Sequence, residues 1–144
     1  MMIVNTINQL EIGDKAEFSK TVSESDVYLY AGITGDFNPV HINEVYAKKT
    51  YFKTRIVHGM LVGGLISTVL SKQLPGPGSI YVGQDLNFLA PVIIGDTITA
   101  KVEIVEIKVK ENRVRLKTTC VNQDGTTVLE GEAIISPQKE PEKK

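Results

Sequence analysis

The segment GMLVGGLISTVLSK, residues 59–72, contains the most apolar run in the chain. Its apolar residues would lie nearly all around a helix, and this pattern predicts a helix that is buried rather than on the surface. Gly63 and Gly64 would let another backbone approach it closely. Proline and glycine at 75–78 are expected to end the segment. The apolar run at 60–70 has about half the length needed to cross a bilayer, so it predicts a core helix and no membrane span.

Downstream of this helix the apolar residues recur with a period of two, which predicts strands. A weak strand at 16–21 precedes the helix, and long strands follow it from residue 80 onward. The alternation slips at Val105, so we expect a bulge near Ile104–Val105. An Asp124-Gly125 pair predicts the last hairpin. The inward-facing residues of the successive strands are expected to be Val82, Leu86, Phe88 and Ala90; Ile98, Ala100, Val102, Ile104, Ile107 and Val109; Val114, Leu116, Thr118 and Cys120; and Leu129, Gly131, Ala133 and Ile135. The pattern predicts an α+β fold with an antiparallel sheet around one central buried helix.

Upstream, Ser23 with Asp26 three residues later predicts the start of a helix over 24–31 that ends at Gly32. A second short helix is expected over 43–49, with Asn43 as its cap.

Between these helices lies TGDFNPVH, residues 34–41. Asp36 and His41 would diverge by about 140° on a helix, and Pro39 disfavours helix at the residue before it. We therefore expect a bent loop, which can aim both side chains at one point. A carboxylate and an imidazole that share one small volume suit general acid–base chemistry on a water molecule.

Each of these residues also has a purely structural interpretation. Asp36 is the type of aspartate that satisfies turn backbone, and His41 would pack between Val40 and Ile42. Their pairing in one short segment favours catalysis for His41, whereas for Asp36 the turn role stays open from these residues alone. Asn38 is expected to be mainly structural, because it can hold the bend and orient His41 as a possible support.

The start of the apolar helix offers a second set of polar groups. A helix that begins at Gly59 presents free backbone N–H groups, which suit a developing negative charge on a carbonyl oxygen. His58 is expected to fix the loop before the helix. Ser67, a little over two turns further on, needs a partner in an apolar interior. It would bond a backbone carbonyl or support Asp36.

The pattern TGDFNPVH, followed by Tyr46-Ala47 and by IVHGML at 56–61, resembles the MaoC-type (R)-specific enoyl-CoA hydratases of the hot-dog fold. The resemblance extends over about residues 12–136. It implies reversible addition of water to a trans-2-enoyl-CoA, with Asp36 and His41 as the catalytic pair and the Gly59 N–H on the thioester oxygen. It also implies a homodimer, a small acyl-CoA thioester as substrate, and no cofactor beyond the coenzyme A that the substrate carries.

Apolar residues near these groups are candidates for the acyl pocket: Phe37, Met60, Leu65 and Leu70. The nearest cations, for which a solvated role is the alternative to coenzyme A phosphate binding, are Lys48, Lys49, Lys53 and Arg55.

Two other functions stay open at this point. Some hot-dog proteins are acyl-CoA thioesterases that use a carboxylate on the central helix, but residues 59–72 contain no Asp or Glu. A non-catalytic acyl-thioester binding module would have the same pocket without needing Asp36 and His41.

Composition bounds the remaining possibilities. A length of 144 residues suggests one domain, expected over 1–136, followed by a disordered charged tail at 137–144. The net charge of −1 without a basic block gives no sign of nucleic-acid or membrane-surface binding. The single cysteine, Cys120, and the lack of a signal-like start predict a cytoplasmic protein. With two histidines and no paired ligand spacing, no metal site is expected.

Overall fold

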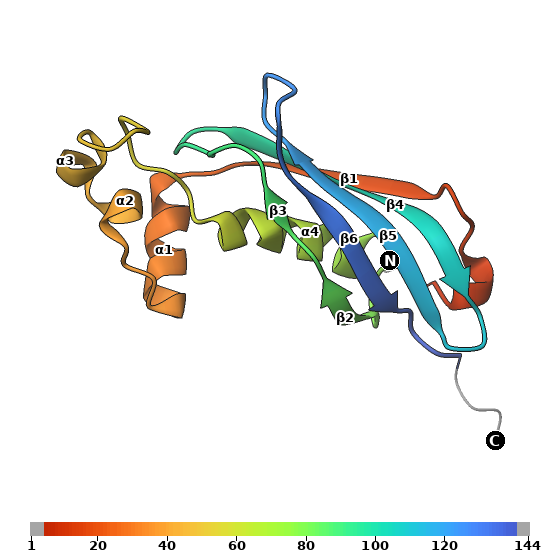
Figure 1. Cartoon of the computed structure of the whole chain (residues 1–144). Helices are drawn as coiled ribbons and strands as arrows, with labels where there is room; N and C mark the ends of the chain where they lie inside the picture. Colours follow the sequence, from red (N-terminus) through yellow and green to blue (C-terminus); the bar gives the residue numbers. More distant parts are fainter. Residues whose placement is uncertain (1–4, 141–144) are drawn as a thin grey trace.

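The computed structural model describes residues 5–140. One antiparallel sheet curves around one long helix, with a group of short helices at one end (Figure 1). The strands are β1 (Lys15–Thr21), β2 (Ile80–Gln84), β3 (Asn87–Phe88), β4 (Thr97–Lys108), β5 (Arg113–Val121) and β6 (Thr127–Ser136). The helices are the 3-10 turn η1 (Ile7–Gln9), α1 (Glu24–Thr34), α2 (Pro39–Ile42), α3 (Glu44–Ala47) and α4 (Gly59–Lys72). The sheet has the order β1-β4-β5-β6-β2, and β3 also pairs with β6.

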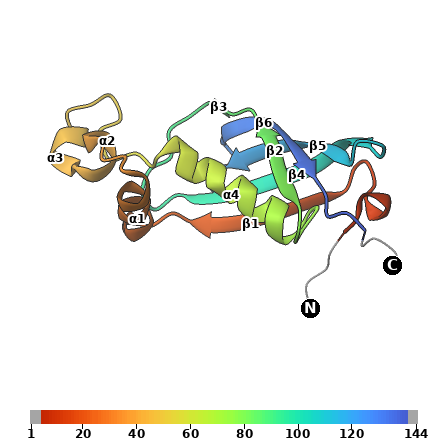
Figure 2. The same cartoon turned by 90° about the horizontal axis from the view of Figure 1, so that it is seen from below.

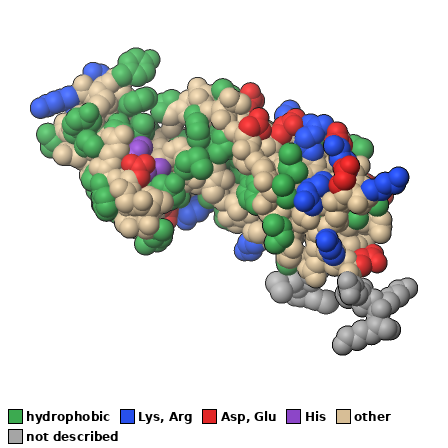
Figure 3. All heavy atoms as spheres, turned by 60° about the horizontal axis from the view of Figure 1, so that its bottom comes forward, with side chains coloured by type: hydrophobic (Ala, Val, Ile, Leu, Met, Phe, Trp, Pro, Cys, Tyr) green, Lys and Arg blue, Asp and Glu red, His purple; other side chains and the backbone are tan. Residues whose placement is uncertain are grey.

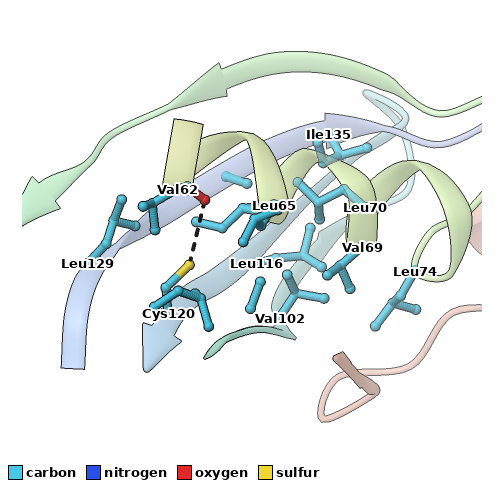
Figure 4. Packing of buried hydrophobic residues seen from close by; sticks show 14 of the residues in the cluster. Val62, Leu65, Val69, Leu70, Leu74, Val102, Leu116, Cys120, Leu129 and Ile135 are labelled. Atoms are coloured by element: carbon cyan, nitrogen blue, oxygen red, sulfur yellow. Dashed lines mark hydrogen bonds between the residues drawn. The ribbon is translucent and has the colours of Figure 1, made fainter. Parts of the chain in front are cut away.

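Helix α4 has the predicted bounds and forms the centre of the core. Its buried side chains are Val62, Leu65, Ile66, Val69 and Leu70. They pack on buried residues of the sheet, among them Val102, Leu116, Cys120, Leu129 and Ile135 (Figure 4). Burying one such side chain fully is worth about 1.5–3 kcal/mol, so this contact is a main source of stability.

The expectation that α4 is buried all round is wrong for the single chain. Met60 is 58% exposed, and Gly64 is also exposed. The physical reason is geometric, because one sheet covers only one side of a helix (Figure 2). The uncovered side of α4 carries Gly63, Gly64 and Ser67 beside the edge of β2.

Strands β4, β5 and β6 follow the predicted alternation. The expected inward residues of β5 are buried, as are Leu129, Ala133 and Ile135 of β6. In β4, the expected residues Ile98, Ala100, Val102 and Ile104 are buried, and Ile107 is partly buried. The predicted bulge is present, because the β4–β5 register shifts between Ile104 and Glu106. The prediction that Val109 faces inward is wrong, because this residue follows the end of β4 and is 58% exposed.

The long strand predicted from residue 80 is divided into β2 and β3. Between them, the Asp85 carboxylate accepts a hydrogen bond from the Glu132 N–H at 2.6 Å, and the Asp85 N–H donates to the Glu132 carbonyl at 3.1 Å. The Asp85 carbonyl lies where a Cβ on Gly131 would be, so only glycine fits there. Val82 lies at the register irregularity of the edge strand β2 and is exposed rather than inward-facing. Phe88 of the short strand β3 is exposed as well.

Helix α1 begins as predicted but ends later. Ser23 and Asp26 form the expected reciprocal cap. The helix passes through Gly32 and ends at Gly35, whose φ of 82° is in the left-handed region and whose N–H donates to Ala31 O at 2.8 Å. This ending places Asp36 directly after the glycine that caps α1.

The C-terminal tail predicted at 137–144 lies only partly within the described residues. The charged tail predicted at 137–144 starts with Pro137, which is buried and whose carbonyl accepts a hydrogen bond from Asn112 at 2.8 Å. Residues 141–144 of that tail lie outside the described residues. Within residues 5–140, no helix combines the length and apolarity that a bilayer crossing needs.

Candidate active site

The segment that carries Asp36 and His41 is a loop only as far as Asn38. Pro39 begins the one-turn helix α2, so His41 lies on a helical turn and not on the expected loop. Proline restricts the residue before it but suits the first turn of a helix. The Asn38 side chain accepts from the Val40 N–H at 3.2 Å, and its carbonyl accepts from the His41 N–H at 2.9 Å. Asn38 thus has a structural position that orients His41.

The structure brings Asp36 and His41 together and adds His58. One ring nitrogen of each histidine and a carboxylate oxygen of Asp36 all lie within 4.8 Å of one another. Asp36 is exposed, whereas His41 and His58 are 8% and 2% exposed. Figure 3 shows the imidazole atoms beside an acidic side chain, with apolar side chains around them.

The hydrogen bond of His41 determines which ring nitrogen is free. Nδ1 lies 2.7 Å from the carbonyl oxygen of Ile56. A carbonyl only accepts hydrogen bonds, so Nδ1 carries the proton. In the neutral ring, Nε2 then has the lone pair that can accept a proton from water.

Burial lowers the pKa of His41 below its ordinary value of 6.5, and the nearby His58 contributes in the same direction. The Ile56 carbonyl and Asp36 act against this shift. We expect NMR titration of His41 to give a pKa below 6.5. Because folding favours the neutral ring, its contribution to the free energy of unfolding is complete above pH 6.5 and is lost as the pH falls through the folded-state pKa. A His41 titration above 6.5 would contradict this geometry.

The N-terminus of α4 faces the same cavity. Among the described residues, the backbone N–H groups of Gly59 and Met60 have no protein acceptor. The helix dipole adds about half a positive charge at this end. A Cβ built on Gly59 would lie 2.7 Å from the Phe88 ring, so glycine lets this ring close over the helix start.

These groups open into one cavity of about 520 Å³. Asp36, His41, His58 and Gly59 supply its polar part. Its apolar wall consists of Phe52, Ile56, Val57, Met60, Val62, Phe88, Leu89, Ala90, Pro91, Val92, Val128 and Leu129. The arrangement can hold an apolar chain and place one water between a carboxylate and an imidazole, opposite free amide donors.

The sequence predicted part of this cavity wall. Met60 lines it, but Leu65 and Leu70 pack in the core, and Phe37 is 57% exposed outside the wall. Ser67 lies in a separate groove along β2, so it does not meet Asp36 within the chain.

Other wall residues were missed. Val128 and Leu129 are adjacent in β6, and both are buried. Leu129 was expected to face inward, but Val128 was not. Two consecutive apolar residues in an alternating strand signal a bulge, and this signal would have found Val128. Nothing in the sequence predicted the hydrogen bond between His41 and the Ile56 carbonyl.

The same cluster raises the question of a metal ion, which the sequence gave no reason to expect. The His41 and His58 rings are stacked, with centroids 3.9 Å apart and planes 27° apart. Ring lone pairs lie in the ring planes, so two stacked rings direct them side by side. One zinc ion about 2.0–2.1 Å from each nitrogen could not meet both lone pairs. The donor geometry therefore suits proton transfer better than metal ligation.

Arg55, one of the cations considered for coenzyme A phosphate binding, instead forms ion pairs within the chain. Its guanidinium donates to Glu24 at 2.6 Å, to Glu44 at 2.9 Å and to the Tyr28 hydroxyl at 2.6 Å. Arg55 lowers the pKa of Glu44 through their hydrogen bond. Arg55 thus joins α1 to α3 beside the site, whereas Lys48, Lys49 and Lys53 are exposed.

Comparison with known proteins identifies the relatives of this chain. Residues 8–126 match the family model described as a MaoC like domain. An (R)-specific enoyl-CoA hydratase from Rhodospirillum rubrum is 50% identical over 93% of this chain and 92% of its own length. One from Aeromonas caviae is 42% identical over 88% of this chain and 94% of its own. The unliganded R-hydratase PhaJ1 from Pseudomonas aeruginosa has a TM-score of 0.89 at 47% identity, covering 94% of this chain and 86% of that one. This structural likeness confirms the hot-dog fold, and the chain belongs to the MaoC-like domain family.

Proposed function

We propose that this chain is an (R)-specific enoyl-CoA hydratase, a lyase that reversibly adds water to trans-2-enoyl-CoA to give (R)-3-hydroxyacyl-CoA. The observation that carries the proposal is the convergence of Asp36 and His41 in a cavity that also contains the free amides of α4. Relatives with this name cover nearly the whole chain at 42% and 50% identity.

The chemistry requires one water to be activated and one enolate to be stabilised. Asp36 and the Nε2 atom of His41 hold the water and take its proton as its oxygen forms a bond to Cβ. The π electrons of the C=C bond move toward the thioester, whose oxygen develops negative charge. The Gly59 N–H donates to this oxygen, and a preorganised donor of this kind is worth about 3–4 kcal/mol. A proton returned by the pair to Cα completes the addition, so no cofactor is needed beyond the coenzyme A of the substrate.

The acyl chain lies along the apolar wall of the cavity. Met60, Phe88, Val128 and Leu129 line this wall. Leu65, Leu70 and Phe37 do not line this cavity, so we do not expect them to contact the acyl chain within the single protein chain. The acyl-CoA is thus the small-molecule partner of the enzyme.

The direct test is an assay of purified protein with trans-2-enoyl-CoAs of four to twelve carbons. We expect loss of the enoyl-thioester absorbance and an (R)-3-hydroxyacyl product in chiral analysis. Release of free thiol from saturated acyl-CoA without hydration would indicate a thioesterase. The absence of Asp and Glu from α4 weighs against that function. Binding of acyl-CoA without turnover of any enoyl-CoA would indicate a binding module.

We also propose that the protein is a homodimer. The outer edge of β2 has no neighbouring strand within the described residues. Apolar side chains beside this edge are exposed, and they are Met60, Ile80, Val82, Phe88 and Leu89. Pairing with a second copy would cover the edge and the open side of α4. Sedimentation equilibrium is expected to give twice the chain mass, and Val82→Lys is expected to shift it toward one chain. A monomeric wild type would contradict the proposal.

The remaining expectations form part of the same proposal. One domain over residues 1–136 accommodates the family match and the single core. Cys120 is free and buried, which is compatible with a reducing compartment, and we propose a cytoplasmic enzyme that binds neither nucleic acid nor membrane.

A further inference from the structure

His58 has an unusual position for the residue before a helix. It is the N-cap of α4, yet its side chain makes no cap hydrogen bond and is buried. Nε2 instead donates to the backbone carbonyl of Asp36 at 3.0 Å. Its Nδ1 atom is buried and has no partner among the described residues. A buried polar atom without a partner costs free energy, so stability alone does not explain a histidine here.

The hydrogen bond from His58 Nε2 anchors Asp36 to the core. The other hydrogen bonds of Asp36 stay inside its own segment. Its N–H donates to Thr34 at 3.2 Å, and its carboxylate accepts from the Asn38 N–H at 3.3 Å. Within the described residues, His58 is therefore the only hydrogen-bond link between Asp36 and the part of the chain that carries Gly59.

The face of the same ring supports His41. The two rings are stacked at 3.9 Å, and Tyr30 packs against His58 with a centroid distance of 4.7 Å. The χ2 torsion of histidine has a broad distribution. The hydrogen bond to Ile56 alone therefore leaves the His41 ring free to rotate over a range of χ2 angles. Stacking on His58 restricts that motion.

We propose that His58 is a positioning residue that holds both Asp36 and His41 at their working distance from the Gly59 N–H. It holds the first through its Nε2–H and the second through its ring face. No step of the proposed reaction uses a proton or a lone pair of His58. This inference rests on the proposed hydratase function.

Two substitutions separate the two contacts. In His58→Gln, the amide nitrogen reaches about the place of Nε2, which keeps a donor to Asp36 but removes the stacked ring. In His58→Phe, the ring remains and the donor is lost. Both are expected to lower kcat roughly 10- to 100-fold with KM changed less than about threefold, because a misplacement near 1 Å can cost that much.

A readout that is independent of activity accompanies the kinetics. Backbone ¹⁵N relaxation of Asp36 and Phe37 is expected to show added motion in His58→Phe and little change in His58→Gln. The ring ¹⁵N shifts of His41 are expected to move more in His58→Gln. Val69→Ala is the control, since it removes buried core volume on the same helix away from the cavity, and its kcat should be unchanged while the protein is folded.

The outcomes distinguish this inference from the proposed function. If wild type hydrates enoyl-CoA and both His58 variants keep kcat within about twofold, the positioning role is wrong and the function stands. An equal loss of kcat in Val69→Ala would also overturn the role, because stability would then explain the effect. If wild type hydrates nothing, the proposed function fails, and the relaxation pattern alone supports or rejects the link to Asp36.

Discussion

Asp36→Asn is expected to lower kcat by about 10²–10⁴-fold, the usual range for removing a positioned acid–base group. The change keeps the shape of the side chain. Its oxygen can still accept from the Asn38 N–H, and the backbone carbonyl still accepts from His58. Only the ability to take a proton is removed, so the folded structure should not change.

Loss of enoyl-thioester absorbance measures this effect, and circular dichroism checks the fold. Asp124→Asn is the matched control, because Asp124 is exposed in the hairpin turn between β5 and β6. Turnover close to wild type in Asp36→Asn would remove Asp36 from the mechanism.

His41→Asn is the second substitution with a large expected effect, again about 10²–10⁴-fold in kcat. The amide nitrogen of asparagine stands near the place of Nδ1, so it can keep the hydrogen bond to the Ile56 carbonyl at little cost to the fold. The lone pair of Nε2 disappears, and no group then shares the water with Asp36.

The two substitutions together test whether the residues act on one water. If they do, the double variant should lose little more than the worse single variant, because residues that work as a unit are not additive. A loss equal to the product of the single losses would show two independent roles. The same steady-state assay decides between these results.

Much of the fold could be predicted because buried positions give a periodic pattern of apolar residues in the sequence. The bounds of α4 and the bulge after Ile104 both follow from where apolar residues repeat and slip. The edge of the sheet could not be predicted in this way. The break at Asp85 depends on hydrogen bonds to Glu132, on a strand far away in the sequence.

The site shows the same division. The side chains of Asp36 and His41 stand in one short motif, so their meeting was predictable. The wall residues Val128 and Leu129 come from the far end of the chain, where only the folded sheet places them near Gly59. His58 was expected to fix the loop before α4, whereas the structure shows it bonded to the Asp36 carbonyl and stacked on His41. Neither contact leaves a trace in the spacing of the sequence.

The glycine that ends α1 determines where Asp36 lies. Gly32 and Gly35 are both possible helix ends in the sequence, and only Gly35 has a positive φ. A helix ending at Gly32 would have released Asp36 into a longer and less ordered loop.

The layout of the molecule has a consequence for its behaviour on heating. Asp36 and His41 belong to the group of short helices at one end, whereas Gly59 begins the helix that the sheet holds (Figure 1). Proteins open in parts, and elements with little buried apolar surface open first. Warming should therefore abolish activity reversibly while most of the secondary structure is still intact. Cooling should restore the activity without refolding of the sheet.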